Sequence, residues 1–289
     1  MSDTQKCPAG GADSGVTNRR EEIKQQEKRL TERMSQVKHK VVVLSGKGGV
    51  GKSTVAANLA AALAETGREV GLLDADIHGP SAPRIFNLED QGASSDGENI
   101  VPVSYQDNLK IMSIGFLLQA RNDAVIWRGP LKMNVLRQFL SDVRWGELDF
   151  LVIDLPPGTG DEPLSIGQLI PDADGGIVVT TPQGLALNDV RKCINFCQQI
   201  QLPVLGVVEN MSGFICPHCG EKSDIFGTGG GETMAGEMDV PFLARIPIDP
   251  AVVLSCEGEG PHVMIHPESA TTEAFQPVVD TVLDLESSN

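Results

Sequence analysis

Residues 46–53 read GKGGVGKS and form the most informative stretch of the chain. The apolar run Val41–Ser45, which predicts a strand, precedes it, and the alanine-rich run Lys52–Glu65, which predicts a helix, follows it. A strand, a glycine-rich turn and a helix in this order are typical of a phosphate-binding P-loop. Because glycine has no Cβ atom, the backbone N–H groups of such a turn can point inward at phosphate oxygens, next to the positive end of the helix.

The residues of this loop have separate expected roles. Lys52 is expected to reach the β- and γ-phosphates of a nucleotide, and the Ser53 hydroxyl is expected to ligate Mg²⁺. A glycine-rich turn formed by chance is the alternative, and the flanking strand and helix patterns argue against it. The predicted nucleotide-binding residues of the loop are Gly46, Gly48, Gly49, Val50, Gly51, Lys52, Ser53 and Thr54.

The rest of the chain alternates between strand and helix patterns, which is typical of a mostly parallel sheet covered by helices on both faces. Further strands are expected at Val70–Asp74, Leu109–Ile114, Phe150–Asp154, Ile177–Thr181, Val204–Glu209 and Phe242–Ile246. Further helices are expected at Lys132–Val143, from Leu185 to about Gln201, and at Ser269–Leu285. No repeat and no long linker divides this region, so we predict one doubly wound α/β P-loop NTPase domain over residues 38–289.

Residues 1–37 are expected to form a separate terminal segment. Residues 1–17 are rich in glycine and polar side chains, which predicts a mobile terminus. From about Arg19 to Lys40 the chain is highly charged, with apolar residues near heptad spacing, which predicts an amphipathic helix. We expect this helix to dock on the main domain; a short coiled-coil contact with a second chain is the alternative.

The composition limits the classes of partner. A formal net charge of −16 and an aromatic content of 4% argue against a nucleic-acid partner. The first residues lack the apolar segment of a secretory signal, and the apolar runs are too short to cross a bilayer, so we predict a cytoplasmic protein without a membrane partner. In a reducing cytoplasm, the six cysteines are expected to be metal ligands, buried side chains or reactive thiols rather than disulfides.

Two expected strands end in carboxylates, at the edge where an open α/β sheet places its ligand. Asp154 follows an apolar strand and is the candidate Walker B carboxylate, which holds Mg²⁺ through water. Asp74 and Asp76 follow the second strand and precede the turn HGPSAP. For aspartates at strand ends, a role as a helix N-cap or turn residue is the alternative.

The motif KGGVGKS resembles the deviant Walker A motif of the ATPase subclass that contains the nitrogenase iron protein, the Min-system ATPase and the plasmid-partition ATPases. The resemblance implies that Lys47 reaches across a dimer to the partner's nucleotide, in a role comparable to an arginine finger. Without the resemblance, Lys47 could be a solvated lysine. The resemblance also implies that Asp76 positions or activates the attacking water, so the expected catalytic residues are Lys47, Lys52 and Asp76.

Asn210 follows another expected strand. Related ATPases use an asparagine at this place to read adenine, because its amide offers one donor and one acceptor to the base edge. The loop Ile246–Asp249 resembles the segment that closes over the base, which adds Pro247 and Asp249 to the expected nucleotide-binding residues. The N-K-x-D motif of guanine-specific proteins is absent from the sequence, which favours ATP over GTP.

Cys216 and Cys219 form a C-x-x-C pair within the stretch NMSGFICPHCG at 210–220. Two thiolates can hold one edge of a metal site, but zinc or an iron–sulfur cluster needs further ligands. A homodimer would supply four thiolates on its two-fold axis. One half of a zinc knuckle is the alternative.

Together the motifs resemble the Mrp/ApbC-type iron–sulfur cluster carriers over nearly all of residues 38–285. The stretches that carry the resemblance are the P-loop, DADIHGPS (74–81), WRGP (127–130), IDLPPGTGD (153–161), TTPQ (180–183), ENMSGFICPHC (209–219) and IPIDP (246–250). The resemblance implies an ATP-hydrolysing homodimer in which Cys216 and Cys219 of two subunits hold a bridging 4Fe–4S cluster. It also implies that the dimer passes this cluster to apo-proteins.

Two other functions are alternatives to a cluster carrier. A positioning ATPase of the Min or partition type, with structural zinc at the C-x-x-C pair, needs a basic helix or surface, whereas the C-terminal tail is acidic. A reductase like the nitrogenase iron protein needs a cysteine just after the Walker B strand, and 154–160 contain none. Of the remaining cysteines, Cys193 and Cys197 are expected to be buried side chains, while Cys7 and Cys256 receive no role.

Overall fold

The computed structural model describes residues 13–117, 129–216 and 218–287. Within these residues, nine strands form one mixed, mostly parallel sheet in the order β10-β9-β8-β1-β7-β2-β6-β5, with β11 also paired to β9. The strands are β1 (Val37–Leu44), β2 (Val70–Asp74), β5 (Val103–Gln106), β6 (Leu109–Ser113), β7 (Leu148–Asp154), β8 (Gly175–Thr180), β9 (Val204–Ile215), β10 (Lys222–Ser223) and β11 (Phe242–Ile248). The prediction of a doubly wound, mostly parallel sheet is confirmed. Two short strands, β3 (Ser94–Ser95) and β4 (Ile100–Val101), pair with each other beside it.

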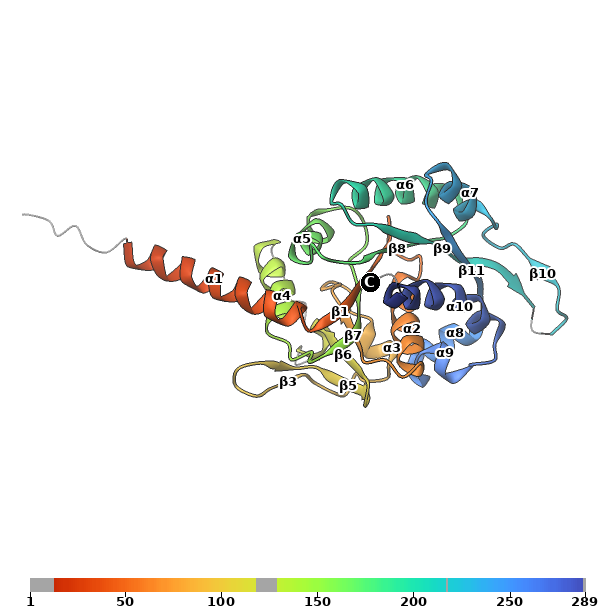
Figure 1. Cartoon of the computed structure of the whole chain (residues 1–289). Helices are drawn as coiled ribbons and strands as arrows, with labels where there is room; N and C mark the ends of the chain where they lie inside the picture. The colour runs from red at the N-terminus through yellow and green to blue at the C-terminus, as the bar shows by residue number, and fades with distance from the viewer. Residues whose placement is uncertain (1–12, 118–128, 217, 288–289) are drawn as a thin grey trace, which may run out of the picture.

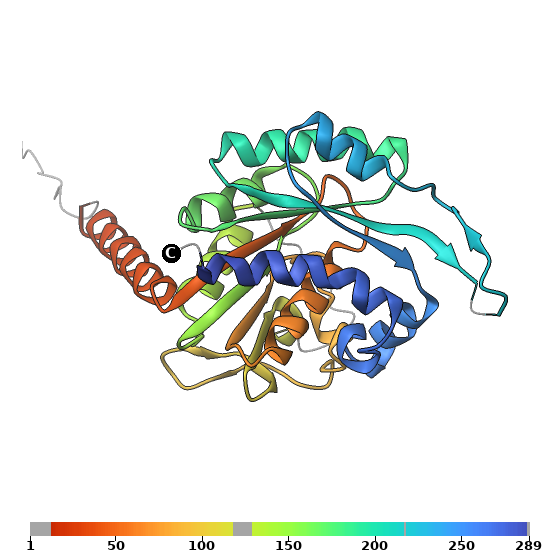
Figure 2. The ribbon, with the colours of Figure 1, turned by 45° about the vertical axis from the view of Figure 1, so that its right-hand side comes forward.

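Helices cover both faces of the sheet (Figures 1 and 2). One face packs against α2 (Lys52–Glu65), α3 (Ala82–Ile85), α9 (His262–Ile265) and α10 (Ala270–Leu283). The other face packs against α4 (Gly129–Ser141), α5 (Asp161–Leu169), α6 (Gly184–Gln199) and α7 (Gly230–Glu237). Strand β1 shows the cause: Val41 and Val43 lie in the first core, and Val42 and Leu44 lie in the second. Side chains of a strand alternate between faces, so an uninterrupted apolar strand must be covered twice.

The sheet brings the loop and two of the predicted carboxylates to one edge. Strand β1 pairs in parallel with β7, and β7 pairs in parallel with β2, so that Asp154 lies in register with Asp74 and with Val43. The P-loop begins two residues after Leu44 ends β1. The loop and both carboxylates therefore lie together at the carboxyl edge of the sheet, as such folds place their ligands.

The N-terminal helix has different limits from the predicted ones. Helix α1 runs from Asp13 to Met34, so it begins inside the stretch expected to be mobile and ends before Lys40. Residues 37–40 belong to β1 instead, because the side chains of Val37, His39 and Lys40 are buried there. The predicted mobility of residues 1–12, and the thiol of Cys7, lie outside the described residues.

The C-terminal part of α1 docks on the same chain. Arg29 forms an ion pair with Asp142, just after α4, at 3.8 Å, and Met34 is buried in the second core. The rest of the helix projects from the body (Figure 1). Helices α5 and α7 were not anticipated, and β9 continues past the predicted end at Glu209 as far as Ile215.

Candidate nucleotide site and cysteine hairpin

The P-loop has close neighbours at two of its glycines. A Cβ atom on Gly46 would lie 2.2 Å from the backbone oxygen of Asp189, and one on Gly51 would lie 2.1 Å from the side-chain nitrogen of Asn210. Gly51 also has a φ of 81°, in the left-handed region that favours glycine, where it precedes α2. Packing as well as phosphate access therefore demands glycine at these two positions.

Lys52 is buried and forms an ion pair with Asp154, the predicted Walker B carboxylate. Burial raises the pKa of the Asp154 carboxyl, and the Lys52 ammonium and Ser53 hydroxyl oppose this shift. The Ser53 hydroxyl also lies 3.3 Å from the ammonium of Lys52. Lys52, Ser53 and Asp154, the side chains predicted to hold a triphosphate and Mg²⁺, therefore lie next to one another. Asp154 and Ser53 offer carboxylate and hydroxyl oxygens, and Mg²⁺ prefers oxygen ligands.

The two aspartates after β2 have different environments. Asp74 is buried and accepts hydrogen bonds from the backbone N–H groups of Ser81 and Ala82, at 2.9 and 3.0 Å, where α3 begins. Burial and the charge of Asp154 raise the pKa of Asp74 to about 7. Asp76 is only half-buried and accepts from the backbone of His78 and Gly79 at 3.2 Å. Asp74 therefore organises the turn, which was the alternative weighed for it, and the catalytic role of Asp76 stays a prediction.

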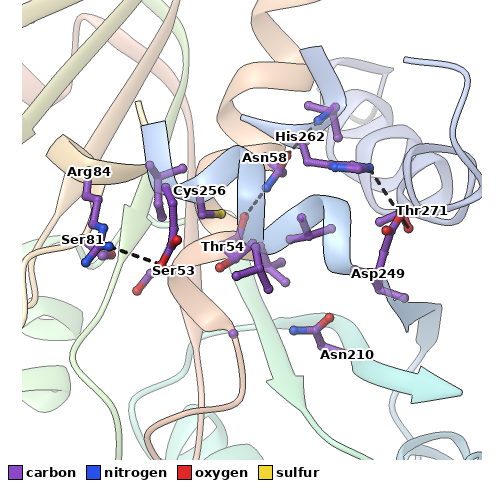
Figure 3. A pocket seen from close by; sticks show the side chains of 18 of the residues that line it. Ser53, Thr54, Asn58, Ser81, Arg84, Asn210, Asp249, Cys256, His262 and Thr271 are labelled. Atoms are coloured by element: carbon purple, nitrogen blue, oxygen red, sulfur yellow. Dashed lines mark hydrogen bonds and ion pairs between the residues drawn. The ribbon is translucent and has the colours of Figure 1, made fainter. Parts of the chain in front are cut away.

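A cavity of about 930 Å³ opens beside the P-loop. Figure 3 shows Ser53 and Thr54 in its wall, with Ser81 and Arg84 on one side and Asn210 and Asp249 on the other. Six predicted nucleotide-binding residues line it: Gly51, Ser53, Thr54, Asn210, Pro247 and Asp249. The volume is within the upper range for small-molecule sites, so a nucleotide fits.

Asn210 and Asp249 both make contacts within the chain. The amide nitrogen of Asn210 donates to the backbone oxygen of Val50 at 2.9 Å. Asp249 caps α8 (Pro250–Leu254) by accepting from the N–H of Ala251 at 2.9 Å, and its second oxygen accepts from the Thr271 hydroxyl at 2.8 Å. Their roles toward adenine stay predictions. Lys47 is half-buried on the P-loop, and its role also stays a prediction.

The far wall of the cavity contains residues that the sequence did not indicate. Cys256 lies in the short helical segment η2 (Ser255–Glu259); burial raises the pKa of its thiol, and a hydrogen bond with Thr54 opposes the shift. His262 is buried, and burial lowers its pKa. An ion pair at 3.3 Å between Arg84 and Glu257 joins α3 to η2. Cys256 received no role in the sequence analysis, and no local pattern marks His262.

The C-x-x-C pair lies in the turn of a hairpin formed by β9 and β10, which extends from the body on the side away from α1 (Figure 1). The backbone N–H of Cys216 donates to Glu221 O at 3.0 Å, and that of Gly220 donates to Cys216 O at 2.9 Å. The Cys216 thiol is half-buried and the Cys219 thiol is exposed. Backbone N–H groups of Cys219 and His218 stabilise the thiolate of Cys216 and lower its pKa. The turn of the hairpin therefore favours the thiolate form of Cys216 more than an ordinary cysteine environment does.

Among the described residues, no cluster of three or more His, Cys, Asp or Glu side chains could hold a metal ion. Cys193 and Cys197 are fully buried in α6, as expected for structural side chains. Three exposed apolar side chains, Ile215, Ile225 and Phe226, lie within the segment that carries the hairpin. In the described part of the chain, no helix has the length and apolar character needed to span a membrane.

The fold and the glycine-rich loop define a P-loop NTPase. A solved MinD cell division ATPase from Pyrococcus furiosus is 24% identical, with a TM-score of 0.62, and the match covers 86% of this chain and 99% of that one; it shows the fold alone. A nucleotide-binding protein from Archaeoglobus fulgidus, solved in complex with ADP and with Co found by PIXE, is 41% identical, with a TM-score of 0.74 over 86% of this chain and 96% of that one.

More specifically, residues 36–283 match the model of the NUBPL iron-transfer P-loop NTPase family, and the chain belongs to that family. An iron–sulfur cluster carrier protein from Methanocaldococcus jannaschii is 47% identical over 96% of both chains. A cytosolic Fe–S cluster assembly factor NUBP2 homolog from Nematostella vectensis is 48% identical over 88% of this chain and 95% of the relative. The resemblance drawn from the motifs is thereby confirmed.

Proposed function

We propose that the chain is an ATP-driven iron–sulfur cluster carrier, acting in the cytosol as a homodimer that delivers a 4Fe–4S cluster to apo-proteins. The observation that carries the proposal is the Cys216/Cys219 pair in the turn of a projecting hairpin, where Cys219 is exposed and backbone N–H groups lower the pKa of Cys216. Relatives at 47% and 48% identity are named as cluster carrier or cluster assembly proteins. Likeness to MinD extends only to the fold, so a positioning ATPase with structural zinc is not favoured.

The thiol pair supports a shared site for its cargo. A 4Fe–4S cluster is held by four thiolates, and one hairpin supplies two. A second copy related by a two-fold axis would bring two more from the same residues. Because Cys219 is exposed, the site is open to a partner and to an acceptor protein. A carrier needs such access, since a cluster enclosed by its own chain could not be released.

The P-loop supports the nucleotide half of the proposal. Lys52, Ser53 and Asp154 would hold the phosphates and Mg²⁺, which supplies positive charge for phosphoryl transfer when bound. Asp76 is the half-buried carboxylate proposed to orient the attacking water. Asn210, Pro247 and Asp249 line the cavity where the base would lie. Hydrolysis is proposed to drive cluster transfer.

We expect the Lys47→Ala variant to bind ATP with wild-type affinity and to hydrolyse it at least about 100-fold more slowly, because a charge supplied in trans acts on the transition state rather than on binding. Single-turnover hydrolysis and calorimetric titration measure the two effects separately. Lys38→Ala is the matched control, since it removes an exposed lysine of β1 from an ion pair with Asp149 of β7. A wild-type hydrolysis rate in Lys47→Ala would contradict the proposed role.

Cluster transfer itself tests the proposed function. The protein is reconstituted anaerobically with iron and sulfide, desalted, and mixed with an apo-protein whose activity requires a 4Fe–4S cluster. We expect the acceptor to be activated in the presence of an iron chelator, because a cluster passed between proteins is not exposed to it. Activation that the chelator abolishes, and that free iron and sulfide match, would show that the chain is not a carrier.

A further inference from the structure

Strand β9 connects the nucleotide cavity to the cysteine hairpin. At the cavity, the side chain of Asn210 contacts the P-loop at Val50 O and Gly51, and Met211 lines the wall. Six residues after Asn210, the same strand leads directly into Cys216. A displacement of β9 at the P-loop would therefore be transmitted along one short length of backbone to the thiol pair.

Strand β11 makes a second connection between the two sites. It supplies Pro247 and Ile248 to the cavity wall. It also pairs in parallel with β9, with Ile246 opposite Asn210 and Ile248 opposite Phe214. Phe214 is two residues before Cys216, so a strand that faces the nucleotide cavity is paired with backbone close to the thiols. The register shifts between Ile246 and Ile248, which marks an irregularity between the two sites.

The irregularity lies in β9, which has more residues than β11 between the two paired positions. We call the stretch 211–213 the kink, because its backbone geometry is unusual. Met211 has a φ of 58° and Gly213 a φ of 78°, both in the left-handed region. A non-glycine residue in this region is uncommon in a strand and is retained where the surroundings demand it. The kink lies between the residues that contact the P-loop and the residues that lead to Cys216.

A buried polar cluster holds the kink in place. Ser212, between the two left-handed residues, donates a hydrogen bond to Glu209 and lies 3.1 Å from the Thr228 hydroxyl. Glu209 is completely buried and accepts from the backbone N–H groups of Gly229, at 2.8 Å, and of Gly231, at the start of α7. A buried carboxylate with these partners is costly to disturb, so it anchors β9 to α7. The kink is thus anchored to the body of the domain through Ser212 and Glu209.

We propose that Ser212 and Glu209 are positioning residues that convert the occupancy of the nucleotide cavity into a change in the spacing or exposure of the Cys216 and Cys219 thiols. Movement of Asn210 and Met211 with the P-loop turns the strand about the pinned kink, and the hairpin beyond it follows. The proposal rests on the proposed function, in which these thiols hold the cargo. By linkage, the state of the thiols acts back on nucleotide affinity to the same degree.

The test measures thiol alkylation in reduced, cluster-free protein with and without Mg-ADP. Cys7 and Cys256 are replaced by serine, the latter because it lines the cavity and would report nucleotide directly. Cys193 and Cys197 are buried, so the labelled thiols are Cys216 and Cys219. We expect saturating Mg-ADP to change their alkylation rate by about fivefold or more, within the usual range of coupling between sites.

Ser212→Ala should keep nucleotide affinity near the parent value while the effect of Mg-ADP on the thiols largely disappears; its melting temperature should fall modestly, because buried Glu209 loses one of its donors. Thr228→Val removes the other partner of the Ser212 hydroxyl and should also reduce the effect. Ser223→Ala is the matched control, because it removes an exposed serine from β10 of the same hairpin, and it should retain the full effect. Full coupling in Ser212→Ala, or no effect of Mg-ADP on the parent thiols, would overturn the proposal. Because the assay contains no cluster, a failure of cluster transfer would be recognised separately.

Discussion

Replacement of Lys52 by alanine is expected to cause a severe loss of ATP binding. The ammonium is the positively charged group of the loop that is expected to reach the β- and γ-phosphates, and it lies buried at the carboxyl edge of the sheet. Truncating one partner of a buried, hydrogen-bonded charge pair costs about 2–5 kcal/mol, which corresponds to a loss of affinity of roughly 30- to 5,000-fold. Calorimetric titration with Mg-ATP measures the loss directly.

The same substitution has a second expected effect on the empty protein. Without Lys52, the buried carboxylate of Asp154 loses its ion-pair partner, which should lower the free energy of unfolding and the melting temperature. Protonation of Asp154 limits this cost, because burial already raises its pKa. Adding Asp154→Asn to Lys52→Ala should restore the melting temperature without restoring ATP binding. The double variant therefore separates loss of fold from loss of function.

Lys192→Ala is the matched control for Lys52→Ala. Lys192 is an exposed lysine paired with Asp189 on the surface of α6, and its removal should change neither ATP affinity nor melting temperature appreciably. If Lys52→Ala bound Mg-ATP as tightly as the wild-type protein, the assignment of the phosphate site to this loop would be wrong.

Replacement of Cys216 by serine is expected to remove the bound cluster and the cluster-dependent dimer together. Serine keeps the size of the side chain but offers a hydroxyl in place of the thiolate that iron prefers. In a shared site, one substitution removes two of four ligands, since each subunit carries it. After anaerobic reconstitution, iron content, visible absorbance and native mass should all fall to the level of the monomeric, cluster-free protein.

Cys219→Ser should have the same effect, and Cys256→Ser is the control. Cys256 lies in the wall of the nucleotide cavity rather than in the hairpin, so its replacement should leave cluster content and dimer mass unchanged. Retention of a full cluster and of the dimer by Cys216→Ser would contradict a bridging site. Dimer formation by the iron-free protein would show that the subunit interface does not depend on the cluster.

The sequence predicted the parts of the site that depend on local pattern. The P-loop, β2 and α2 have unmistakable local signals, and β2 and α2 have the predicted bounds because apolar periodicity and a glycine boundary define them. Only the family resemblance separated Asp76 from Asp74, because both follow the same strand; the fold adds that the turn before α3 encloses Asp74. The end of α1 was misplaced because Val37 continues an apolar spacing that fits a helix and a strand equally well.

The residues of the far wall of the cavity could not be predicted from local sequence patterns. Cys256, His262 and Thr271 come from segments about 200 residues after the P-loop, and only the packing of α9 and α10 on α2 brings them to Thr54 and Asn58. The sequence showed Glu209 only as part of a motif. Its backbone donors are Gly229 and Gly231, at the start of α7, and the sequence did not predict that helix. Long-range polar contacts of this kind leave no periodic signal.

In the nucleotide-free protein, Lys52 is paired with the buried carboxylate of Asp154. This carboxylate therefore competes with an incoming phosphate for the ammonium of Lys52. A phosphate that draws the ammonium away leaves the Asp154 carboxylate without its counter-ion in this buried position. Mg²⁺ would supply that positive charge when bound, so nucleotide and metal should each strengthen the binding of the other. Nucleotide without metal, or metal without nucleotide, would then leave the ion pair of Lys52 and Asp154 intact, and the protein would respond only to the two together.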